Sequence, residues 1–265
     1  MTEAGASDSG QLTLRRLTAR SVVLSVLLSL HPPALAVRDL VRAVEMFDIS
    51  ESALRVALTR MVAAGDLERA DHTYRLSRRL LDRQRRQDEA IAPKLLPWQG
   101  DWDIAVITTT GRSAADRAAL RADLDLQRLG EVREGVWMRP ANLSQEWPPH
   151  LDSQIRRFTG RPNEDPQGLA RDLWDLDGWA RAAEELLALF GEASRRVDRF
   201  TVTAASIRHL LRDPALPPEL LPSTWSGPAL RSACAAYEAE FLALRATAVH
   251  PGATASTPRA STAAE

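Results

Sequence analysis

The sequence predicts an α+β chain built from several domains. Its 265 residues exceed the usual length of one domain, about 100–200 residues. Apolar residues follow helical spacing in the first and last thirds of the chain, whereas residues 102–109 form a β-branched apolar run typical of a buried strand. A single cysteine, Cys234, excludes an internal disulfide framework. The net charge of −1 gives, by itself, no sign of a polyanionic or membrane partner.

The apolar run at residues 22–30 has two interpretations. A pair of arginines precedes it and an Ala-Leu-Ala segment follows it, as in a secretory signal peptide. However, Ser21, Ser25 and Ser29 recur every four residues and would form a polar stripe on a helix. The run is also far shorter than the ~20 residues that span a bilayer. We therefore expect a buried helix and no membrane partner.

Residues 36–47 and 50–62 predict two helices joined by a tight turn. The first has apolar residues on one face, and Ser50 can cap the second by accepting a hydrogen bond from its first turn. Gly65 can end the second helix in the left-handed conformation. Residues 66–76 then indicate two short strands around a polar turn. This order predicts a winged helix-turn-helix domain, which we place at residues 17–92.

The outward side of the second helix would present Ser52, Arg55 and Thr59, with Arg60 beside them. Such side chains hydrogen bond base edges and phosphates in a major groove. An exposed arginine is often only solvated, and some winged helices bind proteins, so a protein-interaction scaffold is the alternative. The predicted DNA-binding residues are Ser50, Ser52, Arg55, Thr59, Arg60 and Arg75.

Charge is divided unevenly along the chain. Lys94 is the only lysine, so nearly every basic residue is an arginine. Residues 15–94 carry a net charge of +5 and the remainder −6, as expected for a DNA reader joined to a separate sensor. Five arginines at 78–86 could approach phosphates, or they belong to a solvated linker helix whose acidic residues lie between them.

Residues 97–165 predict a small ferredoxin-like α/β domain. A strand at 102–109, a helix at 114–129 and a strand at 131–139 form a β-α-β pattern. The stretch from 140 to 174 holds four further prolines, which leave little room for a second helix. Nucleotide-binding and metalloprotease motifs are absent from the sequence, so we expect no catalytic residues, no metal and no cofactor.

Residues 167–246 predict a helical C-terminal domain. Helices are expected at 169–190, 200–211 and 228–244. Residues 1–16 and 247–265 are rich in Ala, Ser, Thr and Gly, and we expect them to be disordered.

Several segments together resemble the PaaX family of transcriptional repressors, which is named for the control of phenylacetic acid catabolism. They lie at 49–65, 98–108, 130–140 and 174–177, and the resemblance covers about residues 20–245. The most specific segment runs from Arg208 through Leu216-Pro217 to Trp225. The chain departs from the family in a short, partly acidic wing at 70–73, and in lacking a tyrosine soon after residue 177.

The resemblance implies a cytoplasmic, homodimeric bacterial regulator. Such a protein would bind palindromic operator DNA and release it when an aryl-acetyl-CoA thioester accumulates. On this reading the predicted effector-binding residues are Trp174, Arg208, His209, Arg212 and Trp225. Two other roles remain open: the tryptophans as core residues, and the arginines and His209 as groups that orient the next loop through Asp213. An acyl-CoA-processing enzyme using Cys234 or His209 is a further alternative, but no nucleophile and base stand at a recognisable spacing.

Overall fold

The computed structural model describes residues 17–144 and 146–249, with side chains described up to 243. The described chain divides into two compact units. The N-terminal unit comprises residues 18–80 together with those from 235 onward, and the central unit comprises residues 81–234. Most of the predicted disordered segments, 1–16 and 250–265, lie outside the described residues.

The N-terminal unit begins with α1 (Ala19–Leu28), which Thr18 caps through a reciprocal pair of hydrogen bonds with Ser21. Val22, Val23 and Leu27 are fully buried, whereas the serine stripe is partly exposed. The apolar run is therefore a buried helix, as predicted. Within the described part of the chain, every helix is too short or too polar to cross a membrane.

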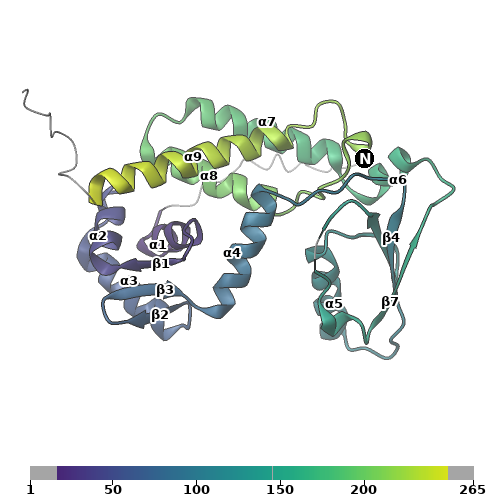
Figure 1. Ribbon diagram of the computed structural model, residues 1–265, viewed down its shortest axis with the longest axis horizontal. Helices are drawn as coiled ribbons and strands as arrows, with labels where there is room; N and C mark the ends of the chain where they lie inside the picture. Colours follow the sequence, from purple (N-terminus) through teal and green to yellow (C-terminus); the bar gives the residue numbers. More distant parts are fainter. Residues whose placement is uncertain (1–16, 145, 250–265) are drawn as a thin grey trace, which may run out of the picture. The chain divides into compact units, whose positions relative to one another are not determined.

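After α1 come β1 (Ala34–Ala36), α2 (Val37–Glu45), α3 (Glu51–Ala63), β2 (Leu67–Ala70) and β3 (Thr73–Leu76). The two helices and the β2–β3 hairpin confirm the prediction for this region (Figure 1). Strand β1 was not predicted, because its pairing partners in β3 lie far along the chain. The resulting sheet is antiparallel, in the order β1-β3-β2.

A buried carboxylate follows the end of α3. Gly65 has φ +69°, and the next residue, Asp66, is 1% exposed. Its Oδ2 accepts a hydrogen bond from Arg20 Nη2 of α1 at 2.7 Å, and its Oδ1 accepts one from Arg79 of α4 (Arg78–Ile91). Asp66 thus ties α1 and the start of α4 to the C-terminal end of α3.

The central unit contains a four-stranded antiparallel sheet in the order β5-β6-β4-β7, formed by β4 (Trp102–Ile107), β5 (Gly130–Arg133), β6 (Val136–Pro140) and β7 (Ile155–Gly160) (Figure 1). The expectation of a single strand at 131–139 was wrong, because the chain reverses at Gly135, which has φ +81°. The described residues between β6 and β7 hold one 3-10 turn, η1 (Pro149–Leu151), in agreement with the limited room expected there.

Each face of this sheet packs against different helices. Leu120 and Leu124 of α5 (Ala114–Leu126) cover the face that carries Ala105 and Trp137. Trp102 and Met138 face the other way, into a cluster with residues of α6 (Pro166–Leu173) and α7 (Leu176–Glu192). The expectation of one helix over 169–190 was wrong: Trp174 is extended, and Asp175 starts α7 by accepting from Gly178 N at 2.9 Å.

The remaining helical elements are α8 (Arg196–Leu210), the 3-10 turn η2 (Pro218–Leu220) and α9 (Gly227–Val249). Helix α9 extends beyond the predicted end at 244 and into the segment from 247 that was expected to be disordered. All seven tryptophans lie between residues 98 and 225, within the central unit.

Candidate nucleic-acid interface and candidate effector site

Helix α3 presents a polar face to solvent. Ser52, Arg55, Thr59 and Arg60 are exposed, while the apolar residues at 54, 58 and 61 are buried in the N-terminal unit. The exposure predicted for these four side chains is confirmed. Their role in binding DNA remains a prediction.

The contacts on this face differ between its two arginines. Arg55 pairs with Glu51 one turn earlier, with Nε at 2.8 Å from Oε1. An exposed pair at this helical spacing contributes about 0.3–0.5 kcal/mol, so Arg55 can exchange Glu51 for another acceptor at little cost. Arg60 makes no ion pair with any described residue. Thr59 Oγ1 donates to the Arg55 carbonyl at 3.0 Å, and Ser50 Oγ caps the helix by accepting from Ala53 N.

The wing is short, and its arginines have partners. Arg75 of β3 pairs with Glu68 of β2, with Nε 3.1 Å from Oε2. Arg69 lies over the ring of Tyr74 at 5.8 Å. The hairpin reverses through two residues, with Asp71 at φ +52°. The wing therefore offers less free positive charge than α3 or α4.

Helix α4 contributes further exposed guanidinium groups. Arg78, Arg83 and Arg86 are exposed and make no ion pair among the residues that the structure describes. Arg85 pairs with Asp82 of the same helix. Unpaired exposed arginines of this kind can contact phosphates without reading sequence.

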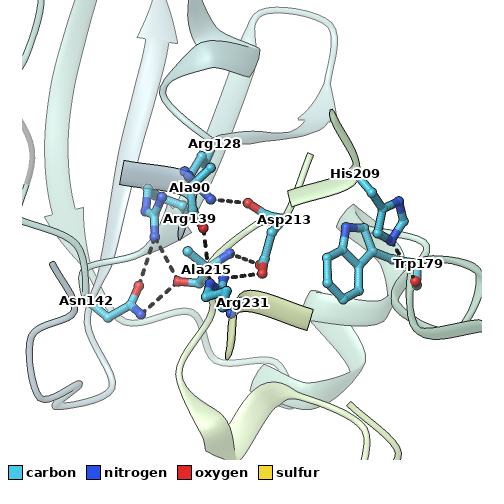
Figure 2. A network of polar contacts seen from close by, with 9 residues as sticks. All are labelled: Ala90, Arg128, Arg139, Asn142, Trp179, His209, Asp213, Ala215 and Arg231. Atoms are coloured by element: carbon cyan, nitrogen blue, oxygen red, sulfur yellow. Dashed lines mark hydrogen bonds and ion pairs between the residues drawn. The ribbon is translucent and has the colours of Figure 1, made fainter. Parts of the chain in front are cut away.

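Two of the predicted effector residues meet on a third aromatic residue. His209 stacks on Trp179 with centroids 4.3 Å apart, and Trp225 stacks on Trp179 at 4.1 Å. His209 Nε2 donates to the Trp179 carbonyl at 2.9 Å (Figure 2). Burial lowers the pKa of His209. This column of three stacked rings is tightly packed, and sequence reasoning did not identify Trp179 as its centre.

The other predicted effector residues lie elsewhere. Trp174 packs against the cluster around Trp102, and a Cβ placed on Gly130 would lie 3.2 Å from its ring. Arg208 and Arg212 are exposed. The structure therefore stacks His209 and Trp225 on Trp179, and Trp225 also packs against the cluster that Trp174 contacts.

Asp213 is the centre of a buried polar network (Figure 2). It is 1% exposed and pairs with Arg231, not with the neighbouring arginines considered from the sequence. Its Oδ1 accepts from Ala215 N at 2.7 Å, and its carbonyl accepts from Arg128. Arg231 also donates from Nε to the Ala90 carbonyl at 3.1 Å. Asp213 thus joins the loop after α8 to α4, α9 and the loop before β5.

Arg139, on strand β6, extends this network through the Ala215 carbonyl. It is 2% exposed and donates to Asn142 Oδ1 at 2.9 Å and to the Ala215 carbonyl at 3.4 Å. Burial, with a smaller contribution from the nearby Arg128, lowers the pKa of Arg139 to about 10. The hydrogen-bond acceptors around Arg139 are neutral, and the Asp213 carboxylate itself pairs with Arg231. The negative charges of Asp103 and Asp213 oppose part of this lowering of the Arg139 pKa.

Comparison with known proteins covers most of the chain. Residues 18–80 match a family model described as PaaX-like protein, residues 96–155 one described as the PaaX protein central Cas2-like domain, and residues 174–250 one described as the PaaX-like protein C-terminal domain. The chain belongs to the PaaX-like family. No curated protein matches it.

One solved structure is similar to this PaaX-like chain over most of its length. The uncharacterized protein Rv0674 from Mycobacterium tuberculosis is 48% identical, with a TM-score of 0.77. The match covers 88% of this chain and 99% of the other. The two chains therefore share their fold along nearly the full length of that protein.

Proposed function

We propose that this PaaX-like protein is a sequence-specific DNA-binding transcriptional regulator. The observation that carries the proposal is the exposed polar face of α3, which lies in the segment matched by the PaaX-like model. A helix that presents serine, threonine and arginine side chains can place them against base edges in a major groove. In this role the chain acts as a regulator and not as an enzyme.

The domain assignments follow from the order of the elements. Residues 18–80 are proposed to be a winged helix-turn-helix, with α3 as recognition helix and β2–β3 as a short wing. The four-stranded sheet with α5 is proposed to be a ferredoxin-like domain that lacks its second helix. Arg78, Arg83 and Arg86 of α4 would add phosphate contacts, which position a protein without specifying sequence.

The proposed regulator is a cytoplasmic homodimer that represses transcription from a palindromic operator. Its effector would be an aryl-acetyl-CoA type thioester, which releases the DNA. The resemblance to the PaaX family supports these points, and two of the predicted effector residues, His209 and Trp225, meet at Trp179. Thermal unfolding with a panel of acyl-CoA thioesters tests the effector, because a ligand at a hundred times its Kd stabilises the folded state by about 2.7 kcal/mol.

DNA binding is tested by fluorescence anisotropy with the promoter fragment beside the protein's own gene. Loss of one bidentate base contact costs about 1–3 kcal/mol, so Arg55→Ala and Arg60→Ala should each weaken specific binding about 5- to 150-fold. Affinity should also fall steeply with salt. Arg156→Ala is the matched control, because this exposed arginine lies on β7 of the central sheet.

Glu51→Gln should not weaken specific DNA binding, in contrast to the two arginine variants. It releases Arg55 from its intrahelical partner, so specific binding should be retained or strengthened. Equal binding of operator and random DNA by wild type and by both arginine variants would contradict the assignment of α3 to base reading. A protein-interaction scaffold, the alternative, would show no DNA binding at any salt concentration.

A further inference from the structure

One face of the central sheet is only half covered. Helix α5 packs over Ala105 and Trp137, and the described residues between β6 and β7 supply a 3-10 turn instead of a second helix. A pocket of about 300 Å³ opens beside α5, on the half of the sheet formed by β4 and β7. Its volume is at the lower end of the range for small-molecule sites, about 300–1,000 Å³.

Strand register places charged groups on this pocket. Asp103 pairs with Arg139 on one side and Thr159 on the other, and Ala105 pairs with Arg157, so these side chains point to the same face. All five residues line the pocket. With two guanidinium groups and one carboxylate, the pocket has a net positive charge.

One guanidinium group at the pocket is available to a ligand. Arg157 lies over the ring of Trp147 at 4.8 Å, and its nearest carboxylate, Asp152, is 4.0 Å away. Stacking uses the flat face of the guanidinium and leaves its N–H edge open. The Trp147 indole nitrogen is buried and has no acceptor among the described residues. The indole therefore contributes its apolar ring surface to the pocket, and the hydrogen bonds to a ligand would come from Arg157.

The rest of the lining is apolar. Leu129 and Leu143 line the pocket together with the indole of Trp147. A flat apolar body fits these side chains, while a carboxylate matches the planar fork of Arg157. Asp103 would repel the carboxylate, and the guanidinium groups of Arg139 and Arg157 in the same lining offset that repulsion.

We propose that this pocket binds a small carboxylate with a flat apolar body. Most of the lining lies in the Cas2-like segment, residues 96–155, and Arg157 and Thr159 follow it on β7. None of the lining residues belongs to the Trp179 column, to which an acyl-CoA effector is assigned. It requires the free acid, because a thioester lacks the carboxylate that Arg157 recognises. The inference does not depend on DNA binding.

Calorimetric titration of the full chain with benzoate, without DNA, tests the proposal. Benzamide is the neutral isostere and should bind about tenfold more weakly, as expected for loss of a hydrogen bond to a charged group. Arg157→Gln should weaken benzoate binding by a similar factor. Arg156→Gln is the matched control, because its side chain points to the opposite face of β7 and should leave the affinity unchanged.

Asp103→Asn supplies a test of opposite sign, since removing the pocket's carboxylate should strengthen benzoate binding several-fold. Benzoyl-CoA should bind wild type and Arg157→Gln equally, or bind neither. Equal affinities for benzoate and benzamide, or no benzoate binding at millimolar concentrations, would overturn the proposal. Because these measurements contain no DNA, their failure would leave the assignment of α3 untouched.

Discussion

Replacing Asp213 by asparagine is expected to destabilise the central unit strongly. Asn can still accept from Ala215 N, but it removes the buried carboxylate that pairs with Arg231. Breaking a buried ion pair by removing one partner costs about 3–5 kcal/mol. The Asp213 and Arg231 side chains are 1% and 16% exposed, so partial hydration of Arg231 favours the lower end, about 3 kcal/mol.

Urea unfolding followed by tryptophan fluorescence measures this loss, because all seven tryptophans lie within the central unit. With a slope of about 1–3 kcal/mol per molar urea, the midpoint should fall by about 1–3 M. Asp101→Asn is the matched control: its pair with Arg161 is 2.7 Å long but exposed on both sides, so its loss should cost less than about 1 kcal/mol. Equal midpoint shifts for the two variants would refute the reasoning.

Three further predictions concern other parts of the fold. Burial lowers the pKa of His209, so the unfolded chain binds the imidazole proton more tightly than the folded chain does. The free energy of unfolding should therefore be highest above pH 6.5 and fall as the pH drops below it. In His209→Gln, the urea midpoint should depend less on pH over this range. Gly130→Ala places a Cβ 2.8 Å from Leu173 Cβ and should lower the free energy of unfolding by about 1–3 kcal/mol in the same urea assay. An unchanged free energy of unfolding would show that β5 can shift to make room. Asp66→Asn weakens the contacts of Arg20 and Arg79, so amides of residues 18–80 should exchange hydrogen faster; unchanged protection would contradict this role.

Capping residues and helical periodicity predicted the helices in which they occur. Ser50 and Gly65 bound α3 as expected, and the serine stripe distinguished a buried α1 from a signal peptide. Strand β1 was missed because its only sheet contacts come from β3. Strand β7 was missed because most of its side chains are exposed, so no apolar alternation marks it.

The candidate sites were predictable to different degrees. The exposed face of α3 follows from helical periodicity alone, so Arg55 and Arg60 were found. The ion pair of Arg55 with Glu51 follows from the same spacing but was not anticipated. Arg139 could not be singled out, because arginine is abundant in this chain and its contact at Ala215 lies 76 residues away. Such contacts are set by tertiary packing and leave no local pattern.

The use of arginine in place of lysine has a consequence for chemical control of this protein. Helices α3 and α4 and the network around Asp213 contain no lysine, and Lys94 is the only one in the chain. Acetylation removes charge from lysine and has no target at any of these sites. Amine-directed reagents should therefore leave these surfaces intact, whereas a dicarbonyl reagent that attacks guanidinium groups should neutralise the exposed arginines of α3 and α4.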